Sequence, residues 1–144
     1  MEHDPRLMET ERREALRVLI VDDSPEIRLM FELALSREAK CDLVGEAEDG
    51  EQALEKVELL RPDVVVMDLQ MPVMDGIDAT REIKSRWPRV EVVGFTSSGR
   101  PAVHDKMVDA GAVDSFDKGQ IKSVLEFIRV RAAARGSVTE PTAG

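Results

Sequence analysis

The sequence predicts an α/β protein built on an open, doubly wound sheet of five parallel strands. Short apolar runs rich in Val and Ile alternate five times with segments whose apolar residues recur at helical spacing. Such alternation is typical of parallel strands joined by right-handed crossovers, with helices on both faces of the sheet. The alternating part covers about 115 residues, whereas a closed eightfold barrel needs roughly 250, so an open sheet is favoured.

The pattern of apolar and turn-forming residues in 16–60 predicts the first two strand–helix pairs. The β-branched run 16–21 is the first strand, and the helix after it begins at Pro25, since proline suits a first helical position. Residues 42–47 alternate more clearly and predict the second strand. An Asp-Gly turn leads into the second helix, which Pro62 ends.

The other three pairs have equally clear boundaries. Residues 63–67 are almost continuously apolar, as is typical of a buried parallel strand, and a helix closed by Trp-Pro follows. The runs 90–95 and 112–116 predict the fourth and fifth strands. Gly111 ends the short fourth helix, and an amphipathic fifth helix carries apolar residues from Ile121 onward.

We expect a charged N-terminal arm at 1–15, one folded domain at 16–133 and a flexible tail at 134–144. The net charge of −9 and the 3% aromatic content argue against nucleic-acid binding. No apolar run approaches the roughly 20 residues of a membrane span, and the N-terminus is unlike a secretion signal. We therefore expect a cytoplasmic protein without membrane contact.

Several other side chains are expected to be structural. The lone Cys41 excludes an internal disulfide, and we expect it to be a small surface or half-buried residue and no redox switch. Neither His3 nor His104 is expected to hold a metal. Three arginines near the end of the last helix are expected to form a solvated face that suits the helix dipole, namely Arg129, Arg131 and Arg135.

Polar side chains follow four of the predicted strands. Asp22 and Asp23 follow the first strand, Asp68 the third and Thr96 the fourth, and the fifth leads to Lys118. Each alone has an ordinary explanation, such as a helix cap. Because the functional crevice of such a sheet lies beyond the carboxyl ends of its strands, we expect these side chains to converge there.

This set of residue types points to magnesium and phosphate. Clustered carboxylates raise one another's pKa unless a cation neutralises them. Oxygen ligands without nearby His or Cys favour Mg²⁺, which often binds phosphate as well. A carboxylate beside Mg²⁺ can attack phosphorus, and an ammonium and a hydroxyl such as those of Lys118 and Thr96 suit the transferred group.

Four segments carry a resemblance to a known family: VLIVDDSPEIR, VVVMDLQMPVMDG, VVGFTSSG and GAVDSFDK. Through them the chain, from Arg17 to about Val130, resembles the receiver domain of two-component response regulators, in particular the single-domain, chemotaxis-regulator-like members. The resemblance implies a flavodoxin-like (βα)5 fold with the strand order 2-1-3-4-5.

The resemblance also implies a role for each residue of the crevice. Asp68 is expected to be the phosphoacceptor, with Asp23 a direct metal ligand and Asp22 acting partly through water. Asp68 itself and the backbone carbonyl of Gln70 are expected to be further Mg²⁺ ligands. Thr96 and Lys118 are expected to contact the phosphoryl group. Ser97 would leave room for that group, and Gln70 and Ser98 stand where side chains influence hydrolysis.

The sequence departs from the receiver pattern twice. Ser115 stands where Tyr or Phe is usual, and Phe116 cannot replace that ring because neighbouring strand residues face opposite sides, so we expect Phe116 in the core. Gly119 stands where a proline usually follows the lysine. Because a cis bond to a non-proline residue costs roughly 2.5–4 kcal/mol, we expect a trans Lys118–Gly119 bond.

The main functional hypothesis is a signalling switch, not an enzyme. A sensor histidine kinase or histidine phosphotransfer protein would phosphorylate Asp68, and the face of the fourth helix, fifth strand and fifth helix would bind a downstream protein or a second copy of the chain. The alternative is a Mg²⁺-dependent phosphohydrolase with an aspartyl-phosphate intermediate, although Gln70 stands where such enzymes carry an acid/base Asp. The complete site argues against a pseudo-receiver. A receiver that belongs to a longer regulator remains open.

Overall fold

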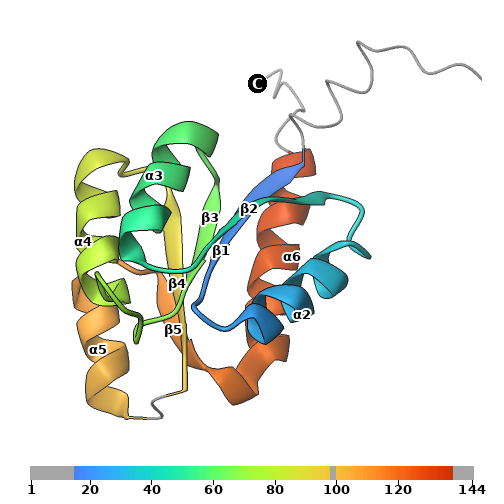
Figure 1. Cartoon of the computed structure of the whole chain (residues 1–144). Helices are drawn as coiled ribbons and strands as arrows, with labels where there is room; N and C mark the ends of the chain where they lie inside the picture. Colours follow the sequence, from blue (N-terminus) through green and yellow to red (C-terminus); the bar gives the residue numbers. More distant parts are fainter. Residues whose placement is uncertain (1–14, 98–99, 138–144) are drawn as a thin grey trace, which may run out of the picture.

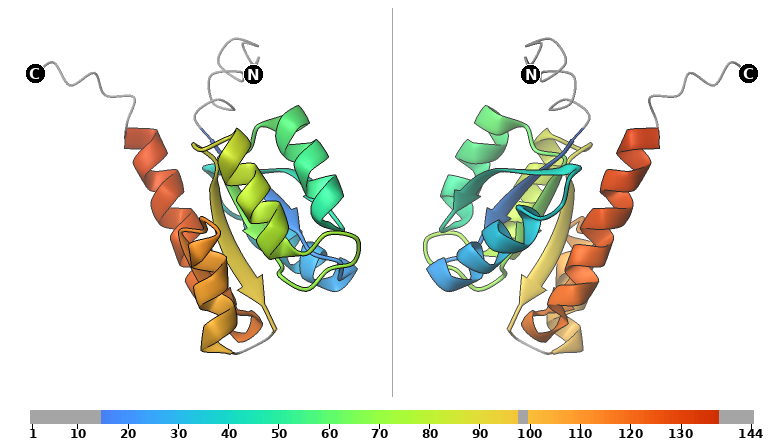
Figure 2. Two further views of the ribbon diagram at one scale, coloured as in Figure 1. Left: turned by 90° about the vertical axis from the view of Figure 1, so that its left-hand side faces the viewer. Right: turned by 90° about the vertical axis from the view of Figure 1, so that its right-hand side faces the viewer.

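The computed structural model describes residues 15–97 and 100–137 and has a central five-stranded parallel sheet. The strand order is β2-β1-β3-β4-β5, as predicted. Helices α2 and α6 cover one face and α3, α4 and α5 the other (Figures 1 and 2). The elements in chain order are β1 (Leu16–Val21), α2 (Pro25–Leu35), β2 (Cys41–Ala47), α3 (Gly50–Leu60), β3 (Val64–Met67), α4 (Gly76–Arg86), β4 (Glu91–Thr96), α5 (Pro101–Asp109), β5 (Asp114–Asp117), the 3-10 turn η1 (Lys118–Gln120) and α6 (Ile121–Ser137).

The two faces of the sheet each pack against their own apolar cluster. Alternate residues of a strand point to opposite faces, so the central strands, buried on both, are nearly all apolar. In β1, Leu19 packs toward α3, α4 and α5, whereas Ile20 packs toward α2 and α6. Phe116 packs on the α2 and α6 side, which confirms its expected place in the core.

Capping side chains set where three of the helices begin. Ser24, Asp49 and Asp75 each accept a hydrogen bond from a backbone amide in the first turn of α2, α3 and α4. Such caps satisfy amides that have no partner within the helix. Because α2 and α4 follow β1 and β3, the caps at Ser24 and Asp75 also fix the loops that carry the acidic residues.

The bounds of β2, β3 and β4 differ by one residue from the expected ranges, and two other boundaries differ by more. Strand β5 is Asp114–Asp117, not 112–116, because Ala112 still belongs to the turn after α5, where its amide bonds the Met107 carbonyl at 3.1 Å. Helix α6 continues to Ser137, past the expected boundary at 134, and Arg135 in its last turn contacts Asp63 at 3.1 Å. The rest of the expected tail, and residues 1–14 of the expected arm with His3, lie outside the described residues.

The arginines of α6 are more than a solvated face, which corrects that expectation. Each forms an ion pair with an acidic side chain far away in the sequence: Arg129 with Glu38 at 2.7 Å, Arg131 with Glu91 at 2.7 Å and Arg135 with Asp63 at 3.1 Å. The Arg129–Glu38 pair is partly exposed to solvent, and ion pairs exposed in this way contribute little to the free energy of unfolding.

Two further observations bear on the expectations. Cys41 is partly buried as expected, and burial raises the pKa of its thiol to about 11, which disfavours the reactive thiolate. Among the described residues, none of the helices has the length and apolar character needed to cross a bilayer.

Candidate functional site

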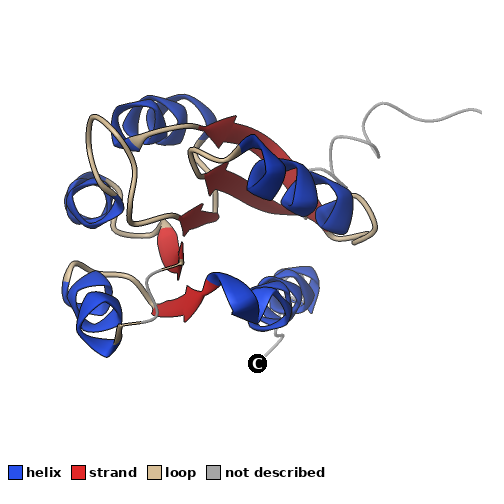
Figure 3. Ribbon diagram, turned by 60° about the horizontal axis from the view of Figure 1, so that its bottom comes forward, coloured by secondary structure: helices blue, strands red, loops and turns tan. Residues whose placement is uncertain are grey.

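Three carboxylates meet at the carboxyl ends of β1 and β3, the edge brought forward in Figure 3. One oxygen each from Asp22, Asp23 and Asp68 lies within 4.8 Å of the others. Asp22 is 2% exposed and Asp68 is 3% exposed, while Asp23 is open to solvent. The structure thus brings together the acidic residues that the sequence placed at this edge.

Lys118 reaches into this acidic cluster from the end of β5. Its Nζ lies 3.1 Å from Asp22 Oδ2 and 3.5 Å from Asp68 Oδ2. Burial alone would lower the pKa of Lys118, but the carboxylates of Asp68 and Asp22 raise it above its ordinary value. The lysine therefore stays charged, and one ammonium faces three carboxylates.

Burial and this excess of negative charge shift the pKa of Asp68. Its burial, and then the charge of Asp22, raise its pKa from 3.8 to about 6, which the Lys118 ammonium offsets only in part. A buried oxygen cluster short of positive charge is the donor set that a hard divalent cation such as Mg²⁺ fits. The residues present therefore fit the metal that the sequence implied.

This pKa shift predicts that the free energy of unfolding decreases as the pH rises from about 4 to about 6. Over this range the unfolded chain has already ionised Asp68, whereas the folded protein still holds the proton. One pKa unit corresponds to about 1.4 kcal/mol, so the loss is roughly 2 to 3 kcal/mol, present above pH 6 and absent at acid pH. Urea unfolding of the wild type and of Asp68→Asn across this range isolates the effect of Asp68. We expect saturating Mg²⁺ to restore the lost stability at neutral pH in the wild type. An identical pH profile for both proteins would contradict the prediction.

Thr96 and Gln70 lie beside the cluster. Thr96 is fully buried at the end of β4, where it pairs in register with Asp117 of β5, and Ser97 after it is exposed. Gln70 is exposed and lines a cleft of about 450 Å³ together with Asp23. Its backbone amide lies 3.4 Å from Asp68 Oδ1. The roles assigned to these residues stay predictions, and Ser98 lies outside the described residues.

The Lys118–Gly119 peptide bond is trans, as expected, since the described residues contain no cis bond. The site also depends on contacts that the sequence argument did not predict. Gly76 packs against the backbone at Asp68, and its amide donates to the Leu69 carbonyl at 2.9 Å.

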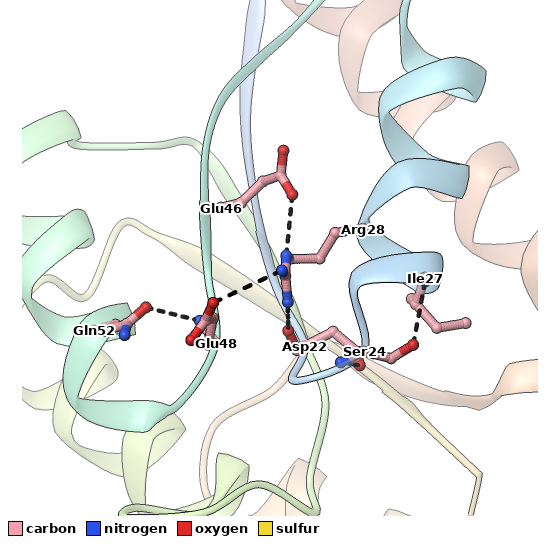
Figure 4. A network of polar contacts seen from close by, with 7 residues as sticks. All are labelled: Asp22, Ser24, Ile27, Arg28, Glu46, Glu48 and Gln52. Atoms are coloured by element: carbon pink, nitrogen blue, oxygen red, sulfur yellow. Dashed lines mark hydrogen bonds and ion pairs between the residues drawn. The ribbon is translucent and has the colours of Figure 1, made fainter.

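Arg28 on α2 holds the turn that carries the acidic pair (Figure 4). Its Nη1 donates to the backbone carbonyl of Asp22 at 2.7 Å, and its Nε donates to Glu46 on β2 at 3.1 Å. Asp22 Oδ1 in turn accepts from the Ser24 amide at 2.9 Å. A positive charge near the start of a helix interacts unfavourably with the helix dipole. The position of Arg28 in the first turns of α2 is therefore a signal in the sequence that could have identified this residue.

Replacing Arg28 with Met is expected to weaken Mg²⁺ binding by about tenfold, the lower end of what loss of a supporting contact costs a metal site. The apolar stem remains, so the loss comes from the contacts with Asp22 and Glu46 and from the longer one with Glu48 at 3.9 Å. Calorimetric titration with Mg²⁺ measures it. Arg37→Met is the matched control, because Arg37 is exposed and its side chain makes no polar contact within the described residues. Equal Mg²⁺ affinity in the two variants would refute the role of Arg28.

Comparison with known proteins shows which family has this fold and this sequence pattern. The family profile of the response regulator receiver domain matches residues 18–128. Among solved structures, the chain is 31% identical to the response regulator domain of Thermotoga maritima CheB, with a TM-score of 0.76 over 83% of this chain and 97% of that one. A LuxR-family two-component response regulator from Aurantimonas is 30% identical, with a TM-score of 0.77 over 84% of this chain and 87% of that one.

The curated relatives are longer proteins. A protein-glutamate methylesterase/protein-glutamine glutaminase of Geobacter metallireducens is 40% identical over 111 residues, which are 76% of this chain but 31% of that protein. A similarly named protein of Bacillus subtilis is 36% identical over 118 residues, 81% of this chain and 33% of that protein. The chain thus spans about a third of the length of the curated relatives it matches.

Proposed function

The chain belongs to the receiver domain family of two-component response regulators, which are phosphoacceptor switches, and we propose that Asp68 is the residue that accepts the phosphoryl group. The observation that carries the proposal is the position of Asp68. It is buried at the end of β3, and its Oδ2 lies 3.5 Å from the ammonium of Lys118, beside the other two carboxylates.

The two buried aspartates differ in how their oxygens are engaged. Asp22 Oδ1 accepts a 2.9 Å hydrogen bond and its Oδ2 lies 3.1 Å from Lys118. The corresponding contacts of Asp68 are longer, 3.4 Å from the Gln70 amide and 3.5 Å from Lys118. Asp68 therefore has the less committed oxygens, which favours it as the nucleophile.

In the proposed step a phosphohistidine of a sensor histidine kinase or phosphotransfer protein is the donor. An oxygen of Asp68 forms a bond to phosphorus while the phosphorus–nitrogen bond of the donor breaks. The electron pair leaves on the imidazole, which takes up a proton. A bound Mg²⁺ would supply positive charge to the carboxylates and the phosphoryl oxygens. Asp22, Asp23, Asp68 and the backbone carbonyl of Gln70 would hold it, and Lys118 and the hydroxyl of Thr96 contact the phosphoryl oxygens.

Phosphohydrolase activity is not favoured. Gln70 stands two residues after Asp68, where an acid/base Asp would be needed, and an amide cannot exchange a proton in that role. The curated relatives carry esterase and glutaminase names, but the part that this chain shares with them is the receiver. For the chain itself we therefore propose phosphoryl acceptance and not ester hydrolysis.

The output surface that we propose is the face formed by α5, β5 and α6, which are the fourth helix, fifth strand and fifth helix of the sequence pattern. Strand β5 is an edge strand of the sheet, and Val108 on α5 is 47% exposed, so this face is open to a downstream protein or to a second copy of the chain. We also propose that the chain works in the cytoplasm, where kinases of this class deliver phosphoryl groups to receivers.

The test uses phosphoramidate, a small phosphodonor, with intact-mass measurement. We expect the chain to gain the mass of one phosphoryl group in Mg²⁺ and none with excess EDTA. Rapid multiple turnover of phosphate esters would instead support the phosphohydrolase. No gain of mass under any Mg²⁺ concentration would overturn the proposed function.

A further inference from the structure

His104 connects helix α5 to the end of strand β5. Its Nδ1 lies 2.6 Å from the hydroxyl of Ser115, and its Nε2 lies 2.9 Å from Asp117 Oδ1. The imidazole is 20% exposed. The neutral form with its proton on Nε2 satisfies both partners, because Nε2–H donates to the carboxylate and Nδ1 accepts from the hydroxyl.

The imidazole contacts Ser115, the position on β5 at which the sequence departs from the receiver pattern. Ser115 and Asp117 are two residues apart on β5 and therefore face the same side, toward α5. Ser115 stands where the resemblance implies an aromatic ring. Opposite it on β4 is Gly94, where an added Cβ would lie 2.5 Å from the Ser115 hydroxyl. With small residues on both strands, the ring that fills the space between α5 and β5 comes from the helix.

Asp117 joins this contact to the phosphorylation site. It immediately precedes Lys118, whose ammonium contacts Asp22 and Asp68. The Asp117 amide also donates to Gln120 Oε1 at 3.0 Å. Gly119 follows the lysine, and an added Cβ there would meet nothing within 4 Å, so no neighbour crowds the chain at that residue. The hydrogen bonds of Asp117 to His104 and Gln120 therefore lie directly beside the Lys118 backbone and help to hold it.

We propose that His104 is a positioning residue that couples the state of Asp68 to helix α5. This inference rests on the proposed function. When Lys118 moves from the carboxylates to a phosphoryl group on Asp68, the shift of its backbone reaches α5 through Asp117 and the imidazole. His104 therefore provides, from the helix, a ring contact to β5 at the position where the resemblance implies an aromatic residue.

The test measures hydrogen exchange of α5 with and without beryllofluoride and Mg²⁺, which together imitate a phosphoryl group on a carboxylate. In the wild type we expect the exchange of α5 amides to change when beryllofluoride binds. In His104→Ala we expect beryllofluoride still to bind, but the response of α5 to fall by at least about fivefold, the lower range of coupling between sites. His104→Gln should retain the response, because its amide offers one acceptor and one donor.

Asp105→Ala is the matched control, since Asp105 is the exposed neighbour on the same helix. A wild-type response of α5 in His104→Ala would overturn the inference alone, as would an equal loss in His104→Gln. Failure of the wild type to bind beryllofluoride would instead overturn the proposed function. Ser115→Ala and Asp117→Ala, which each remove one of the two hydrogen bonds, provide the same comparison if His104→Ala does not fold.

Discussion

Asp68→Asn is expected to abolish phosphoryl labelling of the chain while the protein remains folded. The amide oxygen of Asn is a poor nucleophile, and no other buried carboxylate of the described residues has equally uncommitted oxygens. The fold should tolerate the change, because Asn removes a charge that its neighbours oppose. Intact-mass measurement after exposure to phosphoramidate and Mg²⁺ reads the labelling directly, and we expect a loss of more than about a thousandfold in rate.

Asp22→Asn is the matched control for this variant. Asp22 is buried to the same degree and also contacts Lys118, but both of its oxygens are held more closely. We expect Asp22→Asn to label more slowly and to need more Mg²⁺, yet still to reach one phosphoryl group per chain. Label that persists in Asp68→Asn, or that disappears only in Asp22→Asn, would place the phosphoacceptor elsewhere.

The residues at the strand ends could be predicted because parallel topology alone brings them to one edge. Alternating apolar runs establish the strands, and the side chain that follows each strand is then placed within a few residues. The strand order needed the family resemblance, since strand–helix alternation is the same for several orders. The shifted start of β5 shows the limit at a short strand, where the turn after α5 extends to Ala112.

The supporting contacts could not be predicted, because they depend on distances between residues far apart in the sequence. His104 gave no sign that its ring would reach Ser115 and Asp117, since helix spacing alone does not say which neighbour a partly buried side chain meets. The ion pairs of the α6 arginines likewise require the packing of α6 on the sheet. Receiver-like motifs predict which side chains meet in the site, whereas the packing around them comes from the whole fold.

Gly76→Ala is expected to destabilise the protein by about 3 kcal/mol or more and to prevent labelling at Asp68. An added Cβ at Gly76 would overlap the carbonyl oxygen of Asp68 and lie 2.8 Å from its carbonyl carbon. All these atoms are backbone, so no side-chain rotation relieves the overlap. Overpacking typically costs about 1 to 3 kcal/mol, and here either α4 or the chain at the phosphoacceptor has to move.

Gly119→Ala is the control that separates this close approach from a general cost of replacing glycine. A Cβ at Gly119 meets nothing within 4 Å, so we expect stability within about 0.5 kcal/mol of the wild type and normal labelling. Urea unfolding gives the free energies, and phosphoramidate labelling gives the functional effect. If Gly76→Ala folds with wild-type stability and still accepts phosphate, contact between the start of α4 and the Asp68 backbone is not what positions the carboxylate. If only labelling is lost, the overlap is relieved by moving Asp68 and not α4.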